Sequence, residues 1–295
     1  MSERQRYRSI FRPALSEGQL HIVTGGGSGI GRCTAHELAS LGATVVVIGR
    51  NEAKLDEVVA EIEQDGGKAE RAAADIRDED AVRAVVSDIV TRHGRIHGLV
   101  NNAGGQFTSP LMFINKKGFD AVLATNLTGG FLMMREVFLQ SMREHGGAIV
   151  NMAADMWNGM PGMAHSGAAR ASMVNLTKTA AFEWAFAGVR VNCVAPGWIA
   201  SSGMDRYEGA VKALIPKLKD HVPLRRLGTE AELSAAICFL LSEGAAFISG
   251  VTLRIDGAAP LRNALMDMGA YNPAPEFQGF HRAKTPEILK KDDEQ

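Results

Sequence analysis

A glycine-rich turn at residues 24–32, TGGGSGIGR, has the composition of a phosphate-binding loop. It follows the apolar run LHIVT and opens a helical pattern, and Gly25, Gly29 and Gly31 have the spacing GxxxGxG. Glycine lets the backbone approach a pyrophosphate closely, while the start of the helix supplies free N–H groups and a favourable dipole. A turn that is rich in glycine for packing alone is the alternative, which the flanking strand and helix disfavour.

A cation ends the second apolar run, TVVVIGR at residues 44–50. In a dinucleotide-binding fold, an acidic residue at this point binds the ribose 2′-hydroxyl and repels a 2′-phosphate. Arg50 stands here instead, and its planar guanidinium matches phosphate oxygens. The sequence therefore favours NADP(H) over NAD(H). An Arg50 that is merely solvated is the alternative, and Ser28 in the glycine turn adds no second cation.

Alternating apolar runs and helical patterns position these residues. Strands are predicted at residues 20–25, 44–49, 68–76, 96–102, 147–152, 189–196 and 251–256, and helices at 29–41, 51–64, 78–93, 118–144, 164–187 and 229–242. Such alternation gives parallel βαβ units, and right-handed crossovers place helices on both sides. The predicted fold class is α/β: a single Rossmann-type, doubly wound, parallel seven-stranded sheet with helices on both faces.

One domain, residues 19–260, is expected to bind the dinucleotide and carry the catalytic groups, and three segments flank or interrupt it. Residues 1–18 form an N-terminal arm that we expect to be solvated, because the basic RQRYR lacks the apolar run of a signal peptide. Residues 203–226 interrupt the alternation and are predicted to form a helical substrate lid. Residues 261–295 form a C-terminal tail that we expect to be partly disordered.

The composition is ordinary for a soluble globular protein. A net charge of -1 and a pI of about 6.7 give no support to nucleic acid or an anionic membrane as partner, and no apolar run reaches transmembrane length. Three separated cysteines and eight scattered histidines fit a reducing compartment and predict no metal site. The ending DEQ is not a peroxisomal signal, so the expected location is the cytoplasm.

Further motifs follow in a fixed order: AADIRD with Asp75, NNAGG at 101–105, TNLTGGF around Asn126 and VAPGWIASSG at 194–203. With the glycine turn, they resemble the short-chain dehydrogenase/reductase family over residues 19–258. The resemblance implies that the glycine loop holds the pyrophosphate, Asp75 contacts the adenine, NNAG lines the cofactor and residues 196–199 cover the nicotinamide end. The expected cofactor-binding residues are Gly25, Ser28, Gly29, Ile30, Gly31, Arg50, Asp75, Ile76, Asn102, Ala103, Gly104, Arg170, Pro196, Gly197 and Ile199.

The stretch MAHSGAARASMVNLTK, residues 163–178, stands where that family keeps its catalytic residues. Usual members use a Ser to polarise a carbonyl, a Tyr to pass the proton, a Lys to bind ribose and an Asn to hold a water. Aligned on LTK, the Tyr position falls on Ser166, the Lys position on Arg170 and the Ser position on Ala153, so only Asn126 is kept. The chain's three tyrosines lie elsewhere in sequence: Tyr7, Tyr207 and Tyr271.

The segment HSGAAR, with NNAGGQFTSP and RVNCVAPG, resembles the branch of enoyl-CoA and dienoyl-CoA reductases, which also replaces the Tyr by Ser. Reducing a carbonyl creates an alkoxide that needs an acid in place. Reducing an α,β-unsaturated thioester gives an enolate, whose charge hydrogen-bond donors hold until carbon is protonated. The resemblance therefore implies NADP(H)-dependent reduction of an acyl-CoA thioester by Asn126, Ser166 and Arg170. Arg170 would bind ribose and add positive charge, Asn126 would orient water and Ser166 would donate a hydrogen bond.

Two other hypotheses stay open. Peroxisomal relatives have a Tyr where this chain has Val174, and bacterial relatives are linked to branched terpenoid alcohols, so a citronellol/citronellal-type dehydrogenase is the second. A cofactor-binding pseudoenzyme is the third, because three of the four catalytic groups are replaced. An apolar stretch suits a greasy substrate or the core: Met152, Met156, Trp157, Met160 and Met163. The resemblance also implies a homotetramer, built by pairing the helices predicted at 118–144 and 164–187.

Overall fold

The structure, a computed structural model, describes residues 6–262, 265, 269 and 272–292. The first five residues of the N-terminal arm, parts of the C-terminal tail and Tyr271 lie outside this description. Seven parallel strands form one sheet in the order β3-β2-β1-β4-β5-β6-β9, which confirms the predicted architecture. The strands are β1 (Leu20–Thr24), β2 (Thr44–Gly49), β3 (Lys68–Ala73), β4 (Gly98–Asn101), β5 (Gly147–Met152), β6 (Val189–Pro196) and β9 (Thr252–Ile255).

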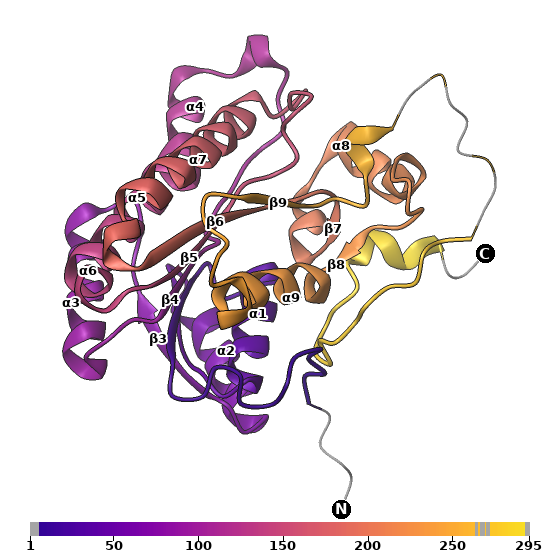
Figure 1. Ribbon diagram of the computed structural model, residues 1–295. Helices are drawn as coiled ribbons and strands as arrows, with labels where there is room; N and C mark the ends of the chain where they lie inside the picture. The colour runs from indigo at the N-terminus through magenta and orange to yellow at the C-terminus, as the bar shows by residue number, and fades with distance from the viewer. Residues whose placement is uncertain (1–5, 263–264, 266–268, 270–271, 293–295) are drawn as a thin grey trace, which may run out of the picture.

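Helices cover both faces of this sheet (Figure 1). One face carries α1 (Gly29–Ser40), α2 (Glu52–Gln64) and α9 (Glu230–Leu241), and the other carries α3 (Glu79–His93), α5 (Gly129–Val137) and α7 (Ala164–Glu183). The two faces have separate cores: Val45 and Val47 of β2 join one, and Val46 and Ile48 join the other. A central strand is thus apolar at every position because successive side chains enter different cores.

The strand predicted at 68–76 has a weak apolar signal for a structural reason. It is β3, an edge strand, and Lys68, Arg71 and Ala73 are exposed. Capping residues mark the neighbouring boundaries better: the Asn51 side chain accepts from the Lys54 N–H at the start of α2, as predicted.

The helix predicted at 118–144 is a longer run with two widened turns. It begins with α4 (Lys116–Leu123) and ends with α6 (Arg143–His145), and α5 lies between two π-helical turns, η2 (Ala124–Thr128) and η3 (Phe138–Met142). These turns were not predicted from sequence, because one added residue per turn leaves no recognisable change in the apolar periodicity. Single π turns are frequent at functional sites, and η2 carries Asn126.

The segment predicted as a lid, 203–226, is helical as expected. It holds most of η5 (Ser202–Arg206), then α8 (Gly209–Leu214) and η6 (Ile215–His221), and it lies between the short parallel strands β7 (Ile199–Ala200) and β8 (Gly228–Thr229). Figure 1 shows it to one side of the sheet, beside the C-terminal segment. The remaining 3₁₀ turns are η1 (Leu111–Phe113), η4 (Ala185–Ala187), η7 (Glu243–Ala245), η8 (Ala259–Leu261) and η9 (Glu287–Asp292).

The described parts of both terminal segments contact the domain, and the arm residue Tyr7 is buried although a solvated arm was expected. The partial disorder expected of the tail stays a prediction. Tyr7 is 8% exposed and donates to Oε2 of Glu37 at 3.1 Å, and Phe280 of the tail is 1% exposed. Arg282 pairs with Asp65 at the end of α2 at 2.7 Å. Glu37 is a fully buried carboxylate on α1 and needs donors, which the arm supplies. Local composition could not reveal this long-range requirement.

Within the described residues, no helix is long and apolar enough to cross a membrane. No group of three or more His, Cys, Asp or Glu residues in that part of the chain could hold a metal ion. Cys33, Cys193 and Cys238 are buried free thiols.

Candidate active site

The glycine loop after β1 lies directly against the chain that follows β4. Gly25 has a left-handed φ of 66°, and a β-carbon there would lie 2.9 Å from Cα of Ala103. A β-carbon at Gly31 would lie 2.5 Å from Nδ2 of Asn102, which donates to the carbonyl of Thr24 at 3.0 Å. Side chains at these positions would push the two segments apart. Glycine therefore lets the loop form a tight cradle at the start of α1.

The N-terminus of α1 is electrostatically suited to an anion. Its N-cap, Ser28, makes no side-chain capping bond, and the first helical turn holds no acidic residue. The orphan N–H groups and the positive end of the helix dipole are therefore uncompensated by side chains of the loop. A pyrophosphate group fits these donors and this cradle.

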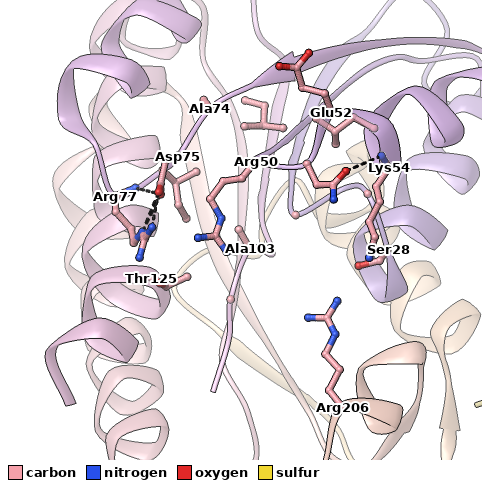
Figure 2. Close-up of a pocket in the computed structure, with 18 residues that line it drawn as sticks. Ser28, Arg50, Glu52, Lys54, Ala74, Asp75, Arg77, Ala103, Thr125 and Arg206 are labelled. Atoms are coloured by element: carbon pink, nitrogen blue, oxygen red, sulfur yellow. Dashed lines mark hydrogen bonds and ion pairs between the residues drawn. The ribbon is translucent and has the colours of Figure 1, made fainter. Parts of the chain in front are cut away.

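A groove of about 700 Å³ extends from this loop to the ends of β2 and β3 (Figure 2). Four exposed cations line it, Arg50, Lys54, Arg77 and Arg206, and Figure 2 shows Arg50 and Arg206 pointing toward the same space. Arg77 pairs with Asp75, whereas no ion pair to Arg50, Lys54 or Arg206 occurs among the described residues. Glu52 also lines the groove, but its carboxylate pairs with Arg71 at 2.7 Å. The groove therefore has a positive wall.

Asp75 closes the groove after β3. Its carboxylate accepts from Nη2 of Arg77 at 2.5 Å and from Nε at 2.9 Å. These hydrogen bonds lower the pKa of Asp75 to about 2, so it is ionised at neutral pH. Arg77 thereby holds an acceptor in a fixed orientation at the groove wall.

A second group of polar residues, called the second centre, adjoins the groove at Gly104 and consists of Gly104, Asn126 and Arg170. Arg170 on α7 is 8% exposed, and its Nη1 donates to the carbonyl of Met152 at the end of β5 at 2.6 Å. Burial lowers the pKa of Arg170 to about 10, so it remains a cation at neutral pH. Asn126 accepts from the Gly105 N–H at 2.8 Å, while its Nδ2 is buried without a hydrogen-bond partner. The centre thus holds a buried cation and an unused donor.

Ser166, one turn before Arg170, is fully buried and bonds to a loop residue. Its Oγ donates to Oε1 of Gln106 at 2.7 Å, and Gln106 donates through Nε2 to the hydroxyl of Tyr207 at 2.9 Å. The fold therefore brings a tyrosine of the predicted lid near the site, although sequence distance suggested none. His165 beside it is also fully buried, and its ring lies 4.3 Å from that of Phe107.

The predicted cofactor-binding residues fall into distinct groups. Those that line the groove are Gly25, Ser28, Arg50, Asp75, Ile76, Ala103 and Gly104. Outside the lining, Gly31 and Asn102 lie against each other where the loop meets the chain after β4, Gly29 begins α1, and Ile30 packs against a core.

The segment 196–199 lies outside the lining of this groove. The carbonyl of Pro196 accepts from the Asp155 N–H at 3.0 Å, Gly197 packs on Asp256, and Ile199 is 7% exposed in β7. Its expected contact with the nicotinamide end stays a prediction.

The sequence analysis missed several residues that the structure places at the site. Lys54 lies in the first turn of α2, where a cation opposes the helix dipole, and that mismatch is a local signal of function. Arg77 follows the predicted site residue Asp75 by two positions, and this short distance in sequence is also a local signal. Gln106, Arg206 and Tyr207 come from loops, and only the fold shows where they lie.

Comparison with known proteins agrees with this geometry. A family model described as enoyl-(acyl carrier protein) reductase matches residues 25–258. A probable 2,4-dienoyl-CoA reductase of Bacillus subtilis is 36% identical over 240 residues, which cover 80% of this chain and 94% of that protein. A solved citronellol catabolism dehydrogenase (AtuB) of Pseudomonas aeruginosa is 62% identical with a TM-score of 0.78, and the match covers 86% of this chain and 99% of that one. A putative NAD(P)-dependent gluconate 5-dehydrogenase of Beutenbergia cavernae, solved with bound NADP, is 30% identical with a TM-score of 0.79, over 85% of this chain and 100% of that one.

The chain belongs to the short-chain dehydrogenase/reductase family and is an oxidoreductase. The sequence has the glycine loop and Asn126 expected of that family, and it has Ser166 and Arg170 where the resemblance predicts the tyrosine and the lysine.

Two adjacent glycines test how tightly the second centre is packed. A β-carbon at Gly104 would lie 2.5 Å from Nη2 of Arg170 and 3.1 Å from Oδ1 of Asn126, whereas one at Gly105 would meet nothing within 4 Å. We expect Gly104→Ala to lower cofactor-dependent turnover at least tenfold, because it displaces both side chains. Gly105→Ala keeps the backbone N–H that donates to Asn126, so the turnover of this variant should match that of the wild type. Equal activity of the two variants would contradict this packing.

A buried carboxyl beside the glycine loop should make stability depend on pH. Glu230 is 8% exposed, its Oε1 lies 3.7 Å from where a β-carbon of Gly29 would be, and burial raises its pKa to about 7. A raised pKa means that the folded protein binds the proton more tightly, so this stabilisation is complete below about pH 4.5 and is lost as pH rises through 7. The unfolding free energy of Glu230→Gln minus that of wild type should therefore rise by about 2 kcal/mol from pH 5 to pH 8. Denaturant unfolding at several pH values measures this, and parallel pH curves for the two proteins would count against it.

Proposed function

We propose that this oxidoreductase uses NADP(H) to reduce the C=C bond of an enoyl-CoA thioester. The observation that carries the proposal is the buried Arg170, whose only hydrogen bond in the described part of the chain goes to the carbonyl of Met152. A permanent cation next to the unused donor of Asn126 suits an anionic oxygen. It is poorly suited to giving up a proton, because a pKa of about 10 keeps the guanidinium charged.

The residues present fit a bound dinucleotide. The glycine cradle and the N-terminus of α1 would hold its pyrophosphate, Asp75 would accept from the adenine, and Arg170 would bind the nicotinamide ribose. When bound, the cofactor supplies a hydride, which adds to the β-carbon of the substrate. Arg170 and Asn126 would then stabilise the enolate charge until the α-carbon takes a proton from solvent water. Ser166 supports this centre from the preceding turn of α7.

The choice of NADP(H) rests on Arg50 and Lys54, two groove cations without an ion-pair partner among the described residues. Together they could form charge-assisted hydrogen bonds to a ribose 2′-phosphate. The bound NADP of the gluconate 5-dehydrogenase neighbour is consistent with this choice.

Cofactor titrations of Arg50→Ala test the assignment. We expect NADPH binding to weaken by about 1.5–3 kcal/mol, the usual contribution of a hydrogen bond to a charged group, while NADH binding stays nearly constant. Lys54→Ala should change NADPH binding in the same direction. Lys117→Ala, which removes an exposed cation outside the groove, is the control and should bind both cofactors as wild type does. Equal losses for NADPH and NADH in Arg50→Ala would oppose the assignment.

A second candidate is a dehydrogenase of branched terpenoid alcohols or aldehydes. The observation that favours it is the 62% identity to the citronellol catabolism dehydrogenase of Pseudomonas aeruginosa. The chemistry of the site argues less for it, because Ala153 and Ser166 replace the groups that polarise and protonate a carbonyl. A cofactor-binding protein without activity is the remaining alternative.

A substrate panel distinguishes the three hypotheses. Purified protein with NADPH should consume straight and methyl-branched 2-enoyl-CoA esters and leave ketones unchanged. Arg170→Ala should lower kcat more than Ser166→Ala does, because it removes both the ribose anchor and the positive charge. Turnover of citronellal or citronellol alone would establish the second candidate, and tight NADPH binding without any turnover would establish the third.

We also propose that the protein acts in the cytoplasm as a homotetramer. Exposed aromatic side chains on α7 and the following 3₁₀ turn, Phe182 and Phe186, support an assembly surface there, since they are 86% and 77% exposed.

A further inference from the structure

The hydroxyl of Ser166 is not free to meet a substrate. The residue is fully buried, and within the described structure its Oγ makes one side-chain hydrogen bond, to Gln106 at 2.7 Å. A buried hydroxyl needs an acceptor for its hydrogen, and Oε1 of Gln106 is that acceptor. Ser166 therefore uses its donor to hold Gln106.

This bond fixes the orientation of the Gln106 amide. Because Oε1 faces Ser166, the Nε2 group faces the other way, and it donates to the hydroxyl oxygen of Tyr207 at 2.9 Å. The backbone next to Gln106 is held too, since the Gly105 N–H donates to Asn126 at 2.8 Å. Hydrogen bonds at Gln106 and Gly105 thus connect α7, the asparagine of the second centre and the lid.

The hydroxyl of Tyr207, unlike that of Ser166, keeps its hydrogen available for a further hydrogen bond. Its oxygen accepts from Gln106, so its hydrogen points elsewhere and remains available as a donor. Tyr207 is partly exposed, directly follows η5 and comes right after Arg206, which lines the cofactor groove. A phenol at this place has both the free hydrogen and the access that Ser166 lacks.

We propose that Tyr207 is the hydroxyl donor to the substrate's carbonyl oxygen, and that Ser166 and Gln106 are positioning residues that orient it. This rests on the proposed function: in an enoyl-CoA thioester, the oxygen that Tyr207 would meet becomes the enolate oxygen. Tyr207 then adds a third stabilising group to Arg170 and Asn126. Since the donor belongs to the lid, the oxygen-binding set is complete when the lid covers the substrate.

Kinetics of conservative variants test the assignment. Tyr207→Phe removes only the hydroxyl, and we expect kcat to fall about 10- to 100-fold with little change in NADPH binding, as for the loss of one bond to a developing charge. Ser166→Ala should cost about two- to fivefold, because Gln106 loses only one of its restraints. Gln106→Leu should lie between them. If Ser166→Ala costs more than Tyr207→Phe, or if Tyr207→Phe keeps wild-type kcat, the proposal is wrong.

A second measurement needs no turnover. The chain has three tyrosines, so protein labelled with 3-fluorotyrosine gives few fluorine resonances, and the spectrum of Tyr207→Phe assigns the one at 207. Adding oct-2-enoyl-CoA to the NADP⁺ complex should shift this resonance and leave that of the buried Tyr7 in place. Gln106→Leu should shift it without ligand.

The two experiments distinguish a failure of the proposed function from a failure of the Tyr207 assignment. If the wild type reduces no enoyl-CoA ester, the proposed function fails, and the resonance at 207 is then followed with citronellal in the NADP⁺ complex. A shift with either compound supports Tyr207 as the donor. No shift with either overturns it, whatever reaction the enzyme catalyses.

Discussion

A guanidinium buried at the end of a central strand is the interaction on which the proposed chemistry of this molecule depends. Removing a cation from water is unfavourable unless nearby groups compensate. Arg170 has a backbone carbonyl at 2.6 Å and no carboxylate in ion-pair distance among the described residues. The site is therefore stabilised by negative charge that arrives from outside. Where a Tyr–Lys pair delivers a proton, this arrangement instead holds a charge in place, which fits an enolate better than an alkoxide.

The fold keeps that cation in position through contacts that converge from separate segments. Met152 ends β5 in the middle of the parallel sheet, and the carboxyl ends of such strands are where open α/β sheets bind ligands. Gly104 leaves room for the guanidinium, and Asn126 accepts from the N–H of the neighbouring Gly105. The glycine cradle and the positive groove lie along the same edge. In the proposed function, cofactor and substrate are thus aligned by one sheet edge rather than by separate domains.

Much of this could be predicted from sequence, and the parts that could not share a physical cause. The seven strands, the glycine loop and the departure at Ser166 and Arg170 leave signals within a few adjacent residues, because apolar runs and glycine spacing are local. Tyr207 is 41 positions from Ser166, and only the path of residues 203–226 brings them within one bridging glutamine. The buried Glu37 and the terminal segments that cover it are likewise a long-range pairing.

The widened turn at η2 has a consequence for how this helix relates to others. A π-helical turn contains one residue more than an α-helical turn, and each residue of an α-helix rotates the chain by about 100°. Removing one residue from η2 would leave a continuous helix but turn Asn126 and everything before it to a different face. We therefore expect the run from Lys116 to His145 to tolerate a deletion in this turn less well than a regular helix would. When this helix is aligned with a regular α-helix, the gap belongs inside the helix rather than in a loop. An alignment that places gaps only in loops would misplace Asn126.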